Sequence, residues 1–157
     1  PTAERVAEIA VQAAELVKRM NIEPSIALLS YSNFGSSDGK TPKKMRDALH
    51  ILHENHPDLT VDGEMQANFA VDKDQLKEQF PFSDLVGSPP NIFIFPGLSS
   101  ANIGYKLLQS MAGMEAVGPL LIGLDYPAHV LQLGADVREI VNTTAMAVVD
   151  AQSRETR

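Results

Sequence analysis

Apolar residues follow two alternating patterns along this chain, one with the period of a helix and one of short continuous runs. Over residues 3–20 apolar positions recur at steps of three and four, which predicts an amphipathic helix with Thr2 as its N-cap. Glu23 and Pro24 end that helix, because Pro cannot continue it and restricts the residue before it. Residues 26–31 are mostly apolar, which is typical of a strand buried on both faces in a parallel sheet.

The rest of the chain repeats this alternation of strand and helix. A loop of small residues leads from the first strand to a helix that begins at Thr41 and Pro42, as N-cap and first helical residue, and runs to about residue 55. Further strands are predicted at residues 59–62, 91–95, 119–124 and 128–131, and further helices at 99–112 and 136–154. This order indicates an α/β, three-layer (α/β/α) domain with a mostly parallel sheet.

Composition and charge narrow the classes of function. The 157 residues suffice for one domain, and the net charge of −7 argues against the basic face that nucleic-acid binders carry. Cysteine is absent, which excludes disulfides, thiolate metal ligands and a Cys nucleophile and fits a cytoplasmic protein. No apolar run has the length of a membrane span, so neither nucleic acid nor a membrane is an expected partner.

Residues 35–41 lie between the first strand and the next helix, in an order that resembles a phosphate-binding P-loop. The spacing argues against nucleotide hydrolysis, because the two glycines are too close together and Pro42 places the helix start after the lysine. A small-residue loop with free backbone N–H groups could still bind a phosphate, and a plain strand-to-helix turn explains the same residues. The basic side chains beside it are Lys40, Lys43, Lys44 and Arg46.

Three histidines, His50, His53 and His56, recur near the end of the second helix. Two His on one helical face can bind zinc, but steps of three drift around the helix and Pro57 follows at once. Imidazoles near a helix C-terminus also interact favourably with the helix dipole. A solvated helix end is therefore favoured, and no metal site is predicted.

Two acidic pairs admit both a functional and a structural interpretation. Asp62 and Glu64 would share one face of a regular strand and could act as an acid–base pair, although a strand end with a glycine turn explains them equally well. Asp136 and Glu139 open the last helix with the spacing of a capping box, and this structural role is sufficient to explain both.

Several segments in order along nearly the whole chain carry a family resemblance. They are residues 29–37, 61–67, 95–107, 118–124 and 140–145. Together they resemble the phosphate acetyl/butyryltransferase (phosphotransacetylase) family. Residues 32–37, 129–132 and 147–152 are similar to one branch, the C-terminal phosphotransacetylase-like domain of NADP-dependent malic enzymes. The resemblance implies that residues 1–157, which begin at Pro1 without an initiator Met, are the second lobe of that fold plus its C-terminal strand and helix, without the first lobe.

Active members of this family move an acetyl group between phosphate and the thiol of CoA. In them a Ser-Arg-Gly run and an acidic residue beyond it supply a hydroxyl, a phosphate-binding guanidinium and a base. Carried over position by position, these roles fall on Gln132, Leu133, Gly134 and Glu139. Leu133 cannot form the bidentate pair with phosphate that Arg offers, so the resemblance implies degenerate catalytic positions in this chain.

The resemblance also implies a cleft that holds CoA or acetyl-CoA. The residues expected to line it are Ser32, Asn33, Gly35, Ser36, Ser37, Tyr105, Lys106, Gln132 and Leu133. NADP and a divalent metal would act only in the malate-decarboxylating part of the parent enzyme, outside this chain.

Three functions remain open at this point. The chain could be an acetyl-CoA-sensing and oligomerisation module of a malic enzyme, a working phosphate acyltransferase, or a purely structural assembly module. The last helix carries an apolar stripe that predicts a homo-oligomer, at least a dimer. Its members are Ile140, Val141, Thr144, Ala145, Val148 and Val149.

Overall fold

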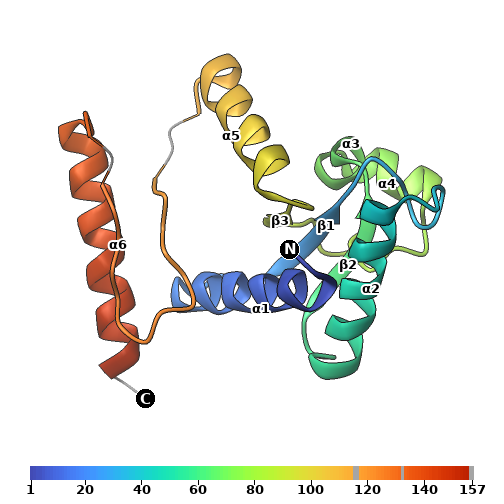
Figure 1. Ribbon diagram of the computed structural model, residues 1–157, viewed down its shortest axis with the longest axis horizontal. Coiled ribbons are helices and arrows are strands. Elements are labelled where there is room, and N and C mark those ends of the chain that lie inside the picture. The colour runs from blue at the N-terminus through green and yellow to red at the C-terminus, as the bar shows by residue number, and fades with distance from the viewer. Residues whose placement is uncertain (115–116, 132, 156–157) are drawn as a thin grey trace.

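The computed structural model describes residues 1–114, 117–131 and 133–155, and Figure 1 shows how the elements are arranged. The elements in chain order are α1 (Ala3–Arg19), β1 (Ser25–Leu29), α2 (Lys40–Asn55), β2 (Thr60–Met65), α3 (Ala67–Val71), α4 (Lys73–Gln79), β3 (Ile92–Ile94), α5 (Leu98–Ala112) and α6 (Val137–Glu155).

The strands form a three-stranded parallel sheet in the order β2-β1-β3. Ile26 of β1 lies opposite Val61 on one side and Ile92 on the other. Because β1 is central and covered on both faces, all of its residues are buried, as its continuous apolar run predicted.

Helices cover both faces of this sheet, which confirms the three-layer α/β/α architecture (Figure 1). On one face α1 and α2 contribute Val6, Ala10, Met45 and Leu52 to a core with Ile26 and Leu28. On the other face α3, α4 and the segment that follows contribute Phe69, Leu76 and Leu85 to a second core with Ala27 and Leu29. The alternate residues of β1 therefore separate two distinct cores.

The two long C-terminal helices lie outside these layers. Figure 1 shows α5 leaving the end of β3 and α6 standing apart from the sheet, near the C-terminal end of α1. No residue of α5 is buried. Arg19 at the end of α1 holds α6 through an ion pair, with its Nη1 2.6 Å from Oδ1 of the buried Asp150.

The predicted strands at residues 119–124 and 128–131 are wrong, because these residues form irregular chain between α5 and α6. Their apolar side chains are half-buried or exposed, and Figure 1 shows this segment passing α1 rather than the free edge of the sheet. A strand exists only where a neighbour pairs its backbone N–H and C=O groups, and this segment has no such neighbour among the described residues.

Two of the predicted helix starts have different outcomes. The assignment of Thr41 as an N-cap is wrong, because α2 already begins at Lys40 with Gly39 as its N-cap. The capping box of α6 is confirmed: Asp136 Oδ1 accepts from the N–H of Glu139 at 2.8 Å, and Glu139 Oε2 accepts from the N–H of Asp136 at 3.0 Å. Among the described helices, none is both long enough and apolar enough to cross a membrane.

Candidate functional site

The loop between β1 and α2 turns sharply at the carboxyl end of the central strand, where open α/β sheets commonly bind ligands. Phe34 and Gly35 take positive φ values of 45° and 88°, a region that suits glycine and is uncommon for a bulky residue. The ring of Phe34 lies 4.8 Å from that of Phe80 and 5.0 Å from that of Phe82, which anchors the turn on the second core.

The carboxylate of Glu64, near the end of β2, accepts hydrogen bonds from this loop. Its side chain is fully buried. Its Oε1 accepts hydrogen bonds from Ser32 Oγ at 2.8 Å, from the N–H of Gly35 at 3.0 Å and from Arg46 Nη1 at 3.0 Å. Three donors from separate parts of the chain therefore converge on one oxygen.

The serines of the loop are connected to one another and to the chain after β2. Ser36 Oγ lies 3.0 Å from Ser32 Oγ and accepts from the N–H of Asn33 at 2.9 Å. Asn33 Oδ1 accepts from the N–H of Gln66 at 2.7 Å. Gln66 Nε2 in turn donates to the carbonyl of Tyr31 at 2.8 Å. The structure thus brings the predicted residues Ser32, Asn33, Gly35, Ser36 and Ser37 together in one ordered loop, with Gly35 and Ser36 exposed.

Most of the basic side chains at the start of α2 are engaged elsewhere. Lys43 pairs with Asp47, with Nζ 2.6 Å from Oδ2, and Lys44 donates to the carbonyl of Pro96. Arg46 donates to the carbonyl of Ser37 as well as to Glu64. Lys40 is exposed and makes no hydrogen bond or ion pair among the described residues, so its positive charge is not neutralised by a neighbouring side chain there.

The other predicted lining residues lie away from the loop. Tyr105 and Lys106 are on the exposed face of α5, where Lys106 Nζ lies 4.8 Å from the centre of the Tyr105 ring and 3.3 Å from Gln109 Oε1. They border a hollow of about 450 Å³ that residues 117–119 close on the other side. No hydrogen bond or ion pair within the described residues joins them to the β1–α2 loop.

The positions that the family resemblance aligns with catalytic residues fall at the end of the irregular segment and in the first turn of α6. Gln132 lies outside the described residues. Leu133 is completely exposed, and Glu139 is engaged in the capping box.

The remaining candidates from the sequence do not form a site. The side chains of Asp62 and Glu64 do not form a pair on one face of the sheet. The register shifts between Leu28 and Leu29 and interrupts the alternation of β2. Asp62 instead accepts from Ser83 Oγ at 2.6 Å. No group of three or more potential metal ligands occurs among the described residues.

The three histidines at the end of α2 are exposed, which agrees with the predicted solvated helix end, and His53 also contacts β2. Its Nε2 lies 3.0 Å from the carbonyl oxygen of Val61, so this imidazole connects α2 to β2. The ring thereby acts as a structural contact between a helix and the strand beside it.

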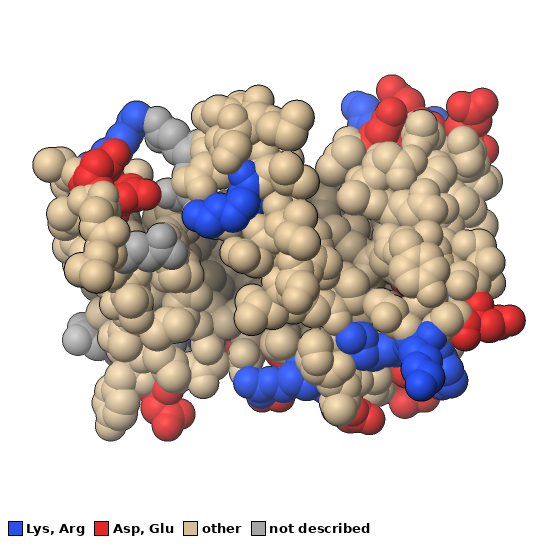
Figure 2. All heavy atoms as spheres, turned by 45° about the horizontal axis from the view of Figure 1, so that its top comes forward, with Lys and Arg blue, Asp and Glu red and all other residues tan. Residues whose placement is uncertain are grey.

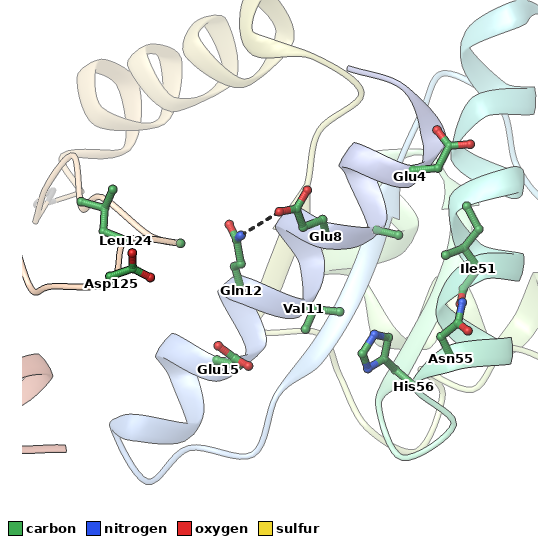
Figure 3. Close-up of a pocket in the computed structure, with 12 residues that line it drawn as sticks. Glu4, Glu8, Val11, Gln12, Glu15, Ile51, Asn55, His56, Leu124 and Asp125 are labelled. Atoms are coloured by element: carbon green, nitrogen blue, oxygen red, sulfur yellow. Dashed lines mark hydrogen bonds between the residues drawn. The ribbon is translucent and has the colours of Figure 1, made fainter. Parts of the chain in front are cut away.

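A further hollow, of about 550 Å³, lies beside α1 (Figure 3). Glu4, Glu8 and Glu15 of α1 face it, and Asp125 approaches it from the irregular segment. A hydrogen bond with Thr2 holds the pKa of Glu4 below its ordinary value. This concentration of carboxylates disfavours the phosphates of CoA, so the β1–α2 loop is the better candidate for an anionic ligand.

Two groups of residues in the structure were missed by the sequence reasoning. Arg46 was considered only as a phosphate ligand, and Glu64 only as part of an acid–base pair. The buried Asp150 and His129, whose Nε2 lies 3.8 Å from Asp150 Oδ2, were not singled out at all. Nothing in the local sequence signals such contacts, because the partners are far apart along the chain.

Comparison with known proteins identifies the protein family to which this chain belongs. Residues 1–148 match the family described as phosphate acetyl/butaryl transferase. The chain therefore belongs to this family, as its resemblance predicted.

Individual relatives come from two kinds of enzyme. The chain is 48% identical over 152 residues to an NADP-dependent malic enzyme of Haemophilus influenzae, covering 97% of this chain and 20% of the enzyme. It is 39% identical over 153 residues to a phosphate acetyltransferase of Clostridium acetobutylicum, covering 97% of this chain and 46% of that enzyme. The crystal structure of a phosphotransacetylase from Streptococcus pyogenes superposes with a TM-score of 0.89 at 38% identity, over 99% of this chain and 46% of the other. The chain thus spans about a fifth of the malic enzyme and about half of the phosphotransacetylases.

Proposed function

We propose that this chain is the phosphotransacetylase-like domain of an NADP-dependent malic enzyme and that it binds acetyl-CoA as a regulatory ligand without catalysing acetyl transfer. The observation that supports the proposal is the 48% identity to a malic enzyme, and the family resemblance, which aligns Leu133 with a phosphate-binding Arg, motivates its second part. Malate decarboxylation with NADP and a divalent metal would belong to another part of the parent chain, and the protein would act in the cytoplasm.

The β1–α2 loop supports ligand binding at this domain. Its exposed Gly35 and Ser36 offer small groups to a ligand, and the free ammonium group of Lys40 adds a positive charge beside them. A CoA molecule carries several phosphate charges, which such a loop and cation would favour. Family relatives named phosphate acetyltransferases handle acetyl groups and phosphate, which fits the same ligand class.

The absence of transferase activity is proposed on chemical grounds. Acyl transfer from a phosphate requires donors that stabilise the developing negative charge, and such donors commonly supply the largest part of the rate. An exposed leucine at position 133 offers no hydrogen bond to phosphate. Glu139 keeps a carboxylate, but the hydrogen bond to Asp136 already engages one of its oxygens.

The proposal is tested on the full-length protein that contains this chain. Malate-dependent NADPH formation is measured with and without acetyl-CoA, and acetyl-CoA binding is measured by calorimetry. Lys40→Ala should weaken binding severalfold, whereas Lys73→Ala, an exposed lysine at the start of α4, should leave binding unchanged. An enzyme that is indifferent to acetyl-CoA and binds none of it would refute the regulatory role.

A working phosphate acyltransferase is a second candidate, favoured by the 39% identity to the Clostridium acetobutylicum enzyme. It is tested by following acetyl-CoA formation from acetyl phosphate and CoA. Activity of the wild-type protein that falls on Glu139→Gln would establish this function in place of the first. The same assay on Leu133→Arg shows whether a guanidinium at that position restores phosphate binding.

An assembly role is a third candidate, favoured by the exposed apolar surface of α5 and α6. Leu98 and Met111 of α5 are 84% and 82% exposed. Figure 2 shows one basic group over α5 in an otherwise uncharged centre of this face, while acidic and basic side chains gather toward its edges. A largely uncharged apolar surface of this kind favours association with another protein surface, so a homo-oligomer, at least a dimer, is the proposed state.

A further inference from the structure

The buried carboxylate of Glu64 is the strongest unexplained electrostatic feature of the site. Removing an ionised carboxylate from water is costly unless charges and hydrogen-bond donors compensate it. Ser32 Oγ, the N–H of Gly35 and Arg46 Nη1 supply that compensation at Oε1, whereas Oε2 is also buried and has no hydrogen-bond partner among the described residues. The compensation of this carboxylate therefore comes from Arg46 and from the β1–α2 loop in the conformation seen here.

Arg46 connects Glu64 to the C-terminal end of the loop, at Ser37. The same Nη1 that pairs with Glu64 also donates to the carbonyl of Ser37 at 3.1 Å. Glu64 therefore holds the first part of the loop through Ser32 and Gly35, and Arg46 holds its last part. Between these two points lie the exposed groups of Gly35 and Ser36.

The backbone of this loop has a shape that needs such support. Phe34 has φ 45° and no residue-specific preference for it, so its conformation depends on surrounding contacts. The N–H of Phe34 donates to the carbonyl of Glu64 at 2.7 Å. The backbone carbonyl and the side chain of Glu64 therefore accept hydrogen bonds from two consecutive residues of the turn, Phe34 and Gly35.

We propose that Glu64 is a positioning residue: with Arg46 as its counter-ion, it fixes residues 32–37 in the single conformation that presents Gly35 and Ser36 to an anionic acyl-CoA-type ligand. The ligand part of this inference rests on the proposed function, whereas the positioning part concerns the loop alone. Glu64 itself does not touch the ligand, because its side chain is fully buried.

Asp62 provides a matched control on the same strand. It is also buried and also accepts hydrogen bonds, from Ser83 Oγ at 2.6 Å and from the N–H of Asp84 at 3.1 Å. Its partners are these two residues after α4 and the N–H of Gly63 in β2, at 2.8 Å, and none of them lies in the β1–α2 loop. Removal of either carboxylate disturbs a buried network, but only removal of Glu64 should release the loop.

The test compares Glu64→Ala, Glu64→Gln and Asp62→Asn by amide hydrogen exchange, thermal unfolding and acetyl-CoA calorimetry. In Glu64→Ala the N–H of Gly35 should exchange about tenfold faster or more, while amides at the centre of β1 keep their protection. Acetyl-CoA affinity should fall about tenfold. Glu64→Gln retains an oxygen for Ser32 and Gly35 and should recover most of the protection, and Asp62→Asn should leave Gly35 unchanged.

Two results would overturn the positioning role: unchanged exchange at Gly35 in Glu64→Ala, or an equal change in Asp62→Asn. If Glu64→Ala does not fold, Arg46→Met decides: loss of the counter-ion of Glu64 should accelerate exchange at the N–H of Gly35, and unchanged exchange there would overturn the positioning role. A wild-type protein that binds no acetyl-CoA would refute the proposed function, and the exchange measurements would still test the positioning role by themselves.

Discussion

Gly63 is a position where both the fold and the candidate site require glycine, because a Cβ atom there would clash with the neighbouring strand. It lies in β2 directly before Glu64 and has φ 146°, in a region that L side chains rarely adopt. A Cβ atom at Gly63 would lie 2.6 Å from the carbonyl oxygen of Leu28 and 2.9 Å from Leu28 Cβ. Leu28 is fully buried in the central strand, so neither strand can move aside without disturbing the core.

We therefore expect Gly63→Ala to destabilise the protein strongly. Overpacking of a core costs about 1–3 kcal/mol and a strained backbone conformation about the same again, which gives a loss of roughly 2–6 kcal/mol in the free energy of unfolding. At about 2–4 °C per kcal/mol for a domain of this size, the midpoint of thermal unfolding should fall by roughly 4–24 °C. Circular dichroism at 222 nm measures this midpoint.

Gly87→Ala is the control for this prediction. A Cβ at Gly87 meets no atom within 4 Å, so its effect should stay within about 0.5 kcal/mol. A midpoint for Gly63→Ala within about 2 °C of that for Gly87→Ala would refute the reasoning, because it would mean that the two strands separate easily at this point. Such a result would also weaken the placement of Glu64 beneath the loop.

Three further predictions test other parts of the structure. Leu52→Ala, in the core under α2, should lower the free energy of unfolding by about 2–5 kcal/mol in urea denaturation. Asp136→Ala should remove about 1 kcal/mol from the first turn of α6 and speed amide exchange there, whereas Glu139→Gln should keep the capping box. Val141→Lys combined with Val148→Lys should convert the proposed oligomer to a monomer in light scattering, and a wild-type protein that is already monomeric would contradict the proposal.

Local sequence patterns predicted the three strands of the sheet and the four long helices, but they missed α3 and α4, which cover the second face of the sheet. The apolar run of β1 predicted a central strand because a strand buried on both faces needs no polar alternation. The spacing of Asp136 and Glu139 predicted a capping box because both partners lie within one helical turn. The start of α4 carried a comparable signal that was overlooked, since Asp72 caps it by accepting from the N–H groups of Asp74 and Gln75.

Contacts between distant segments could not be predicted in this way. Residues 119–131 were assigned strands from their apolar side chains, but strand formation depends on a neighbouring edge that no local pattern reveals. The pairing of Arg46 with Glu64 depends on the register shift that interrupts the alternation of β2, and regular alternation would have placed Glu64 beside Asp62. A one-residue irregularity in a strand thus decides which buried network a carboxylate joins.

The predicted ligand residues fall into two sets, residues 32–37 in the β1–α2 loop and Tyr105 with Lys106 on α5, and no hydrogen bond or ion pair among the described residues joins them. Residues 32–37 are fixed to β2 by a buried charge and several hydrogen bonds, so their conformation is set before any ligand arrives. Tyr105 and Lys106 lie on a helix without a buried residue, and the contact of Lys106 with the Tyr105 ring and its hydrogen bond with Gln109 both stay within that helix. If a ligand contacts both sets, the free energy of any movement of α5 toward the loop comes out of its binding energy. We therefore expect the loop to be the preorganised part of the proposed site and α5 the part that changes position on binding.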